Sequence, residues 1–199
     1  MRRLVENGTD LEVDARFINM LAPRNSRILD IGCGIGTAVS ALRRSGHHAF
    51  GIDPTQAVLD AADLYGTEWY RQLAVEEISQ KRLCSEGLPE RYEVILMAGN
   101  VPAFLPNEVL HGAFRTVSGL LDGGGLFVLG TTVNARGGPE AQEKAAGFAG
   151  LTLLHRFSDW HLGAFDQDSA RSVSVYAKPG ELHPRTGPDG IFILEHPAK

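Results

Sequence analysis

The sequence contains only two cysteines, Cys33 and Cys84, in 199 residues, so it offers no disulfide framework. It has no apolar run near the ~20 residues that a membrane-spanning helix needs. Its basic start is not followed by the apolar core of a signal peptide. Because free cysteines are typical of a reducing compartment, we expect a soluble cytoplasmic protein without a membrane partner.

The chain also lacks an excess of positive charge, with 19 Lys and Arg against 24 Asp and Glu and a net charge of −5. Proteins that bind nucleic acids usually present a basic surface, so this balance disfavours DNA or RNA as a substrate. The histidines and cysteines do not have metal-ligand spacing, and we expect no metal site. Apolar residues make up 43% of the chain, which is typical of a folded domain.

Apolar segments that predict strands alternate with segments that predict helices. Five strand–helix repeats favour a parallel sheet with right-handed crossovers, and two closely spaced strands after them predict an antiparallel edge. The predicted strands are 27–31, 48–52, 68–72, 92–98, 126–130, 151–157 and 172–178, and the predicted helices are 10–21, 37–44, 56–63, 107–121 and 140–148.

Smaller signals mark the ends of these segments. Thr9 and Glu12 have the spacing of a capping box at the start of the first helix. A single helical turn is predicted at 75–79 and a polar loop at 81–91, and the glycines at 123–125 are expected to separate a helix from the next strand. We divide the chain into an N-terminal helix region (1–22), one α/β domain (23–178) and a C-terminal extension (179–199).

A glycine-rich turn at 32–36 lies between the first strand and the helix at 37–44. In an open α/β sheet, ligands bind at this position, where a helix begins at the carboxyl end of a strand. A dinucleotide fingerprint would need glycine at position 37, which is Thr37 here. Asp30 would repel a phosphate and attract an ammonium group. The alternative is a purely structural turn, in which three glycines would be costly without a ligand.

Asp53 ends the second strand, about twenty residues after this turn. A carboxylate there can accept two hydrogen bonds from a ribose diol. NAD and S-adenosylmethionine both contain such a diol, so Asp53 alone does not choose between them. Asp53 and Pro54 are also compatible with the start of a helix.

Residues 28–37 (Ile-Leu-Asp-Ile-Gly-Cys-Gly-Ile-Gly-Thr) resemble the first motif of class I S-adenosylmethionine-dependent methyltransferases, and residues 51–53 (Gly-Ile-Asp) resemble their second. Residues 98–101 with Phe104, and residues 160–162 with Phe165, resemble a subset of small stand-alone bacterial members. This resemblance covers about residues 10–178. It implies a doubly wound, Rossmann-like, mostly parallel α/β sheet of seven strands in the order 3-2-1-4-5-7-6, with an antiparallel edge strand.

The resemblance also implies S-adenosylmethionine as cofactor, S-adenosylhomocysteine as product, and a role for each matching residue. Asp30 would bind the cofactor's amino group and Asp53 its ribose hydroxyls. Members of the family usually carry an acid after the third strand, near the adenine; here either Gln72 replaces it or Glu76 reaches in. The implied cofactor site consists of Asp30, Gly32, Cys33, Gly34, Asp53, Pro54, Gln72, Glu76, Ala98, Gly99 and Asn100. We interpret Cys33 as a small apolar filler rather than a nucleophile, since no histidine is close in sequence.

We expect a small-molecule acceptor over the carboxyl ends of the fourth and fifth strands, near Asn100, Phe104, Thr131 and Trp160. Asn100 is also compatible with a turn, and Trp160 with core or edge packing. His161 is the candidate base for a hydroxyl acceptor, although an amine acceptor would need none; related chains have an acid at this position.

The sequence therefore predicts a methyltransferase that acts on a small molecule by in-line transfer. A non-catalytic, S-adenosylmethionine-binding regulatory module is one alternative. An NAD(P)-linked oxidoreductase is the other, and both the glycine spacing and the absence of a Tyr-x-x-x-Lys arrangement disfavour it.

Overall fold

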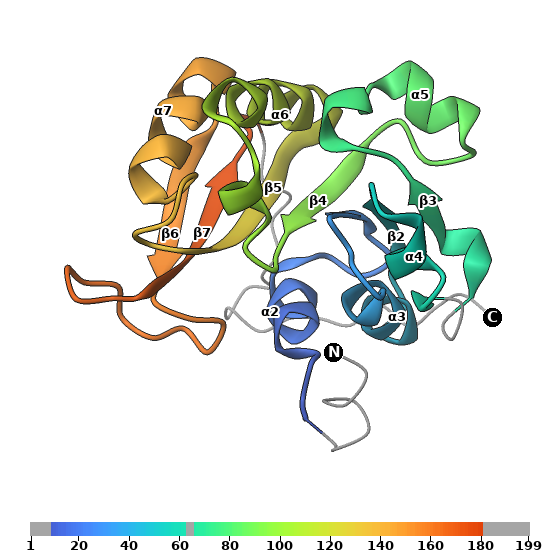
Figure 1. The fold of residues 1–199 in the computed structure, drawn as a ribbon, viewed down its shortest axis with the longest axis horizontal. Coiled ribbons are helices and arrows are strands. Elements are labelled where there is room, and N and C mark those ends of the chain that lie inside the picture. The colour runs from blue at the N-terminus through green and yellow to red at the C-terminus, as the bar shows by residue number, and fades with distance from the viewer. Residues whose placement is uncertain (1–8, 63–65, 181–199) are drawn as a thin grey trace, which may run out of the picture.

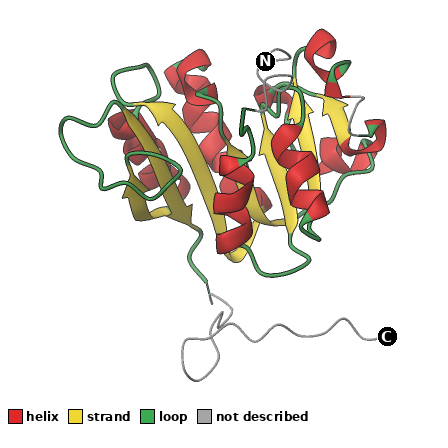
Figure 2. Ribbon diagram, turned by 90° about the horizontal axis from the view of Figure 1, so that it is seen from below, coloured by secondary structure: helices red, strands yellow, loops and turns green. Residues whose placement is uncertain are grey.

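A computed structural model of the chain describes residues 9–62 and 66–180. These residues form one seven-stranded sheet with helices on both faces (Figures 1 and 2). The strands are β1 (Arg27–Ile31), β2 (His48–Asp53), β3 (Tyr70–Gln72), β4 (Tyr92–Met97), β5 (Leu121–Thr132), β6 (Thr152–Phe157) and β7 (Arg171–Ala177). The helices are α2 (Val13–Leu21), α3 (Thr37–Arg44), α4 (Gln56–Leu59), α5 (Gln80–Ser85), α6 (Asn107–Leu120) and α7 (Pro139–Ala149), with 3₁₀ turns η2 (Thr67–Trp69), η3 (Val75–Glu77) and η4 (Val101–Phe104).

The strand order is β3-β2-β1-β4-β5-β7-β6, which confirms the predicted architecture. Strands β1 to β5 are parallel to one another, whereas β7 is antiparallel to both β5 and β6. The carboxyl ends of β1 to β5 therefore lie along one side of the sheet, perpendicular to the strands, which we call the carboxyl edge. The side formed by the amino ends of these strands is the amino edge. Strand β7 begins at the carboxyl edge, where Arg171 pairs with Thr132.

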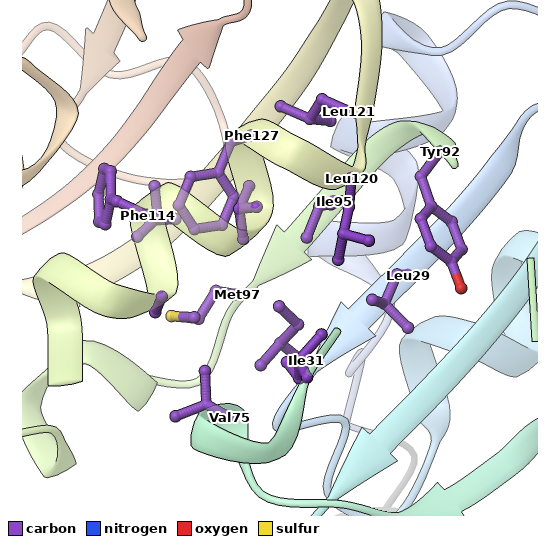
Figure 3. Packing of buried hydrophobic residues seen from close by; sticks show 14 of the residues in the cluster. Leu29, Ile31, Val75, Tyr92, Ile95, Met97, Phe114, Leu120, Leu121 and Phe127 are labelled. Atoms are coloured by element: carbon purple, nitrogen blue, oxygen red, sulfur yellow. The ribbon is translucent and has the colours of Figure 1, made fainter. Parts of the chain in front are cut away.

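Alternate residues of the strands enter two separate cores, one on each face of the sheet. Leu29 packs beneath α5, α6 and α7, whereas its neighbour Ile28 packs against α2 and α3. On the first face, the rings of Phe114 and Phe127 meet edge to face with centroids 5.0 Å apart (Figure 3). Burying each such side chain contributes about 1.5–3 kcal/mol, so both faces help to fix the strands.

The first helix begins at Val13, three residues later than the predicted start. Glu12 occupies the N-cap position but makes no side-chain cap, so the capping-box prediction is wrong. Its carboxylate instead pairs with Arg44 of α3, at 2.5 Å, and its N–H donates to Asp10. A tertiary ion pair has replaced the local cap.

Two further segments differ from prediction. The polar stretch expected as a loop contains α5, which begins after an N-cap at Ser79 and buries Leu83. The glycines at 123–125 do not interrupt the fifth strand, because β5 starts at Leu121 and passes through them. The register with β4 shifts between Tyr92 and Val94, which accommodates this irregular start. Helix α4 is also shorter than predicted, and β3 spans three residues.

The predicted division of the chain remains a prediction at its ends. Of the N-terminal region, residues 9–22 are described, and of the extension at 179–199 only residues 179 and 180 are. Within the described ranges, no helix is both long and apolar enough to cross a membrane.

Candidate functional site

The glycine turn at 32–36 connects β1 to α3 at the carboxyl edge. Gly32, Gly34 and Gly36 have φ angles of +77°, +58° and +81°, a region that side chains rarely adopt. A Cβ on Gly32 would lie 2.5 Å from Val101, and one on Gly36 would lie 2.5 Å from the Tyr70 hydroxyl. A Cβ on Gly34 would meet no atom within 4 Å. Gly34 is therefore the glycine whose bare backbone faces open space, where a ligand can approach.

Asp30 lies in β1 just before this turn. Its side chain is 3% exposed, and its Oδ1 is buried without a hydrogen-bond partner among the described residues. Burial raises the pKa of Asp30 well above its ordinary value, and the charges of Asp14 and Asp53 raise it further. A buried carboxylate without a partner is costly unless a cation or donor reaches it. The residue thus fits the ammonium group of S-adenosylmethionine and opposes a phosphate.

Asp53 ends β2 beside the glycine turn. Its Oδ2 accepts a hydrogen bond from the Gly34 N–H at 3.1 Å, and its Oδ1 accepts one from the Thr55 N–H at 2.9 Å. The carboxylate therefore holds the turn and starts the segment leading to α4. Each oxygen retains accepting capacity, and the side chain is partly exposed, so a diol can still bind.

The two candidates for the adenine contact lie on neighbouring segments. Gln72 is the register partner of Asp53, and its Nε2 donates to the carbonyl of Pro54 at 3.1 Å. Glu76 is exposed in the 3₁₀ turn that follows β3. Gln72 is the last residue of β3 and Glu76 lies in η3 just after it, so both are candidates at the carboxyl edge.

Asn100 joins the carboxyl ends of β4 and β5. It has a left-handed φ of +67°, and its Oδ1 accepts from the Thr131 hydroxyl at 2.9 Å and from the Thr132 N–H at 2.8 Å. Its own N–H donates to Gly130. Asn100 is thus a turn residue that fixes this corner, whereas Thr131 is buried with its hydroxyl already donated. Of the two residues before Asn100, Ala98 is buried and Gly99 is exposed.

Phe104 and Trp160 lie in different environments. Phe104, at the end of η4, is 73% exposed. The ring of Trp160 meets Phe17 edge to face, with centroids 5.5 Å apart, and covers Gly130, where a Cβ would lie 2.6 Å from it. Trp160 is therefore a partly buried packing residue, whereas Phe104 is an exposed aromatic side chain.

His161 follows Trp160 in the β6–β7 loop and is exposed. Its N–H donates to Asp159 at 2.7 Å, which fixes the loop backbone and leaves the ring at the surface. Cys33 is buried, and burial followed by Asp30 and Asp53 raises the pKa of its thiol. The thiol is therefore protonated, in agreement with its interpretation as a filler. No cluster of metal-ligating side chains occurs within residues 9–62 and 66–180.

Sequence reasoning missed two residues at this edge. The Tyr70 hydroxyl donates to the Gly36 carbonyl at 3.0 Å and so supports the turn from β3. Asp14, in the first turn of α2, is partly buried, and burial raises its pKa. Its position three and four residues before Phe17 and Ile18 was the available signal, since it places an acid on the apolar side of a helix.

This Rossmann-like sheet has a buried acid just before its glycine turn and a second acid at the end of the neighbouring strand, which is the arrangement of an S-adenosylmethionine-binding fold. Residues 29–127 match the family model described as a methyltransferase domain. A TehB-like SAM-dependent methyltransferase from Corynebacterium glutamicum superposes with a TM-score of 0.78 at 28% identity, over 89% of this chain and 93% of that one. The chain belongs to the class I S-adenosylmethionine-dependent methyltransferases, which confirms the predicted family and cofactor.

More distant and partial relatives agree. The CcbJ methyltransferase from Streptomyces caelestis shares the fold, with a TM-score of 0.68 at 21% identity over 83% of this chain and 93% of its own. The ubiquinone biosynthesis O-methyltransferase of Pseudomonas putida strain GB-1 is 30% identical over 130 residues, which is 62% of this chain and 53% of that protein. The corresponding Pseudomonas fluorescens protein (strain SBW25) is 32% identical over 111 residues, 54% of this chain and 44% of its own. The chain thus spans about half the length of these curated relatives.

Proposed function

We propose that this protein transfers the methyl group of S-adenosylmethionine to a small-molecule acceptor bound at the carboxyl edge. The unpartnered, buried Oδ1 of Asp30 carries the proposal, because Asp30 comes just before a turn in which the backbone of Gly34 faces open space. A buried acid without a partner costs stability, and a cationic, phosphate-free ligand relieves that cost.

The cofactor would be held by three short segments of the carboxyl edge. Asp30 receives the ammonium group, Gly34 gives the ligand close access to the backbone, and Asp53 accepts from the ribose hydroxyls. The complete set consists of Asp30, Gly32, Cys33, Gly34, Asp53, Pro54, Gln72, Glu76, Ala98, Gly99 and Asn100. Several of these, notably Cys33 and Asn100, act by shaping the backbone rather than by offering a free polar atom.

When bound, S-adenosylmethionine supplies a methyl group activated by a sulfonium. The protein's task is to hold the acceptor atom in line at ~3–3.5 Å and to exclude water. Phe104 offers an exposed aromatic surface for the acceptor, and Asn100 fixes the backbone beside it. Thr131 supports Asn100, and Trp160 forms the wall behind Gly130.

The names of the curated relatives favour a hydroxyl acceptor, since they are O-methyltransferases. A hydroxyl loses its proton on transfer, and a positioned base assists that step. His161 is the candidate, because its ring is exposed in the loop that adjoins Trp160. The net charge of −5 supports a small molecule rather than a nucleic acid.

Titration calorimetry tests the cofactor part of the proposal. S-adenosylhomocysteine should bind in the presence of a chelator, and NAD should bind far more weakly; tighter binding of NAD would reject the assignment. Turnover with panels of phenols and amines then separates an enzyme from a regulatory module. Binding without turnover on any acceptor would favour the module.

A further inference from the structure

Helix α2 places its first turn at the carboxyl edge. It leads into the amino end of β1 through the short segment 22–26, so it runs opposite to β1. Phe17 and Ile18 are buried against the sheet, and residues three and four apart share a side of a helix. Asp14 therefore lies on the core-facing side, one turn nearer the carboxyl edge. In Figure 1, α2 lies beside α3, the helix that follows the glycine turn.

The charges around Asp14 and Asp30 are uncompensated. Asp14 accepts a hydrogen bond from the Ala15 N–H at 2.7 Å, and within the described ranges no ion pair joins it to a basic side chain. The nearby Arg16 is bound to Asp10 through two hydrogen bonds of 3.0 and 2.5 Å. Asp30 has an orphaned Oδ1. Two carboxylates thus lie at the same end of the molecule without a cation.

We infer that Asp14 and Asp30 together form a two-carboxylate site for the ammonium group of the cofactor, with Asp14 a binding residue contributed by the N-terminal helix. The inference rests on the proposed function. A primary ammonium has three N–H donors, so two carboxylates can bind it at once. Its positive charge replaces the repulsion between the acids with two attractions. Because a phosphate would be repelled here, the site favours the ammonium group over an anionic group.

Proton release should accompany this binding. Burial, then the charges of Asp14 and Asp53, raise the pKa of Asp30 well above its ordinary value, so the ligand-free pair retains a proton. Burial also raises the pKa of Asp14, with Asp10 adding to it and Arg16 opposing it. A bound ammonium favours the charged forms and lowers these pKa values. Affinity should therefore increase as the pH rises from the ordinary carboxyl range near ~4 toward neutrality.

The Cys33 thiol also lies near Asp30, but burial and the charges of Asp30 and Asp53 raise its pKa, so it stays protonated throughout that range. Asp53, on β2, adds negative charge near Asp30, but both ligands compared below offer it the same ribose hydroxyls. The pH dependence that distinguishes those ligands is therefore assigned to the Asp14–Asp30 pair.

The test compares two ligands by titration calorimetry near neutral pH. S-adenosylhomocysteine carries the ammonium group, whereas 5′-methylthioadenosine has the same nucleoside and thioether but lacks the amino-acid portion, both its ammonium group and its carboxylate. Asp14→Asn should weaken S-adenosylhomocysteine binding about 10-fold and leave 5′-methylthioadenosine unchanged. Asp10→Asn is the matched comparison: it removes the same charge four residues away, at an exposed position, and acts on Asp14 only through the pKa of that carboxyl, so it should weaken S-adenosylhomocysteine binding far less than Asp14→Asn does.

Proton release is measured on the unaltered protein, in two buffers of different ionisation enthalpy. S-adenosylhomocysteine should release a fraction of a proton that 5′-methylthioadenosine does not, which tests the inference even if Asp14→Asn fails to fold. Equal affinities for Asp14→Asn and Asp10→Asn, or equal proton release by the two ligands, would overturn the inference and leave the proposed function standing. Binding of neither ligand by the unaltered protein would overturn both.

Discussion

Acidic side chains are paired with a cation at the amino edge and lack one at the carboxyl edge. At the amino edge, Arg27 binds Glu93 through its backbone N–H and its guanidinium, and it also binds Asp122 at 2.7 Å. At the carboxyl edge, three residues further along β1, Asp30 is buried without a cation. Strand β1 thus supplies the cation that compensates the acids of β4 and β5 at its amino end, and carries an uncompensated acid near its carboxyl end.

This difference separates stability from function. Because the acids at the amino edge are already paired with Arg27, a ligand would form few new interactions with them. These ion pairs instead connect β1 to β4 and β5. Uncompensated buried charge costs stability, and a ligand that compensates it gains affinity. The amino edge even has a surface hollow of about 370 Å³ lined by Arg27, Glu93 and Asp122, but these groups already satisfy one another. A buried polar atom without a partner is therefore a better indicator of this site than the size of a hollow.

The largest effect should come from Gly34→Val. Its φ of +58° disfavours any side chain, and a Cβ there would project into the open space assigned to the cofactor. We expect S-adenosylhomocysteine binding to fall by more than about 1000-fold, or ~4 kcal/mol. Titration calorimetry measures the affinity, and circular dichroism checks the fold.

Gly46→Val is the matched control from the amino edge. Gly46 has a φ of +88°, and its Cβ would also meet nothing within 4 Å. Both variants should lose similar stability, about 1–2 kcal/mol or somewhat more for a β-branched residue. If both keep their affinity, or both lose it equally, the turn at 32–36 is not where the ligand approaches.

Asp53→Ala should have the next largest effect. It removes the acceptor for the ribose hydroxyls and also the hydrogen bond to Gly34. We expect a loss of roughly 2–4 kcal/mol in S-adenosylhomocysteine binding, about 30- to 1000-fold. Asp53→Asn should lose less, because its amide oxygen still accepts. Asp122→Ala, the amino-edge control, should not alter binding.

A different pair of results would make Asp53 structural only. If Asp53→Ala unfolds the protein while Asp53→Asn binds like the unaltered chain, the residue is a structural cap for the segment at 53–55. Thermal melts of both variants with and without S-adenosylhomocysteine distinguish the two roles.

The parts that sequence predicted well are those where local pattern and tertiary structure agree. The segment at 27–44 was predicted to within a residue, because a buried strand, a glycine turn and a helix each have a strong local signal. The start at 10–21 was misplaced because Glu12 pairs with Arg44, 32 residues away. No local spacing encodes such a partner.

The same limit applies to the site. Asp30 and Asp53 were identified from position at strand ends, but the absence of a cation near Asp30 required the packing of α2 and β2 around it. The sequence left Asn100 as either a ligand-binding or a turn residue. Only its contacts with Thr131 and Thr132 show that it links the ends of β4 and β5. Trp160 was placed near the acceptor, yet its contact with Phe17 depends on a helix far away in sequence.

Asp30→Asn should separate stability from binding at a single residue. The amide keeps the shape and removes the buried charge, so the ligand-free protein should gain about 1–2 kcal/mol in its free energy of unfolding. S-adenosylhomocysteine binding should weaken about 10-fold, since a neutral amide binds an ammonium less well than a carboxylate does.

The pH dependence has a definite sign. A folded-state pKa above the unfolded one of ~3.9 means that unaltered protein loses stability as the pH rises from there through the folded value. Asp30→Asn lacks this loss, so its advantage in thermal melts should grow between acid and neutral pH. If the advantage did not change with pH, the pKa of the Asp30 carboxyl would not be raised as its burial indicates.

The smallest effect should come from Glu93→Gln at the amino edge. Burial raises the pKa of Glu93, but the hydrogen bonds and charge of Arg27 outweigh it and hold the pKa below its ordinary value. A lowered acid pKa stabilises the fold above the unfolded value of ~4.3 and ceases to do so as the pH falls through the folded value. Glu93→Gln should therefore cost about 0.5–1 kcal/mol at neutral pH, since the pair is partly exposed, and nothing in acid. Urea unfolding at several pH values measures this, and S-adenosylhomocysteine affinity should stay unchanged; weaker binding would mean that the two edges are coupled through β1 and β4, and the contrast between them would fail.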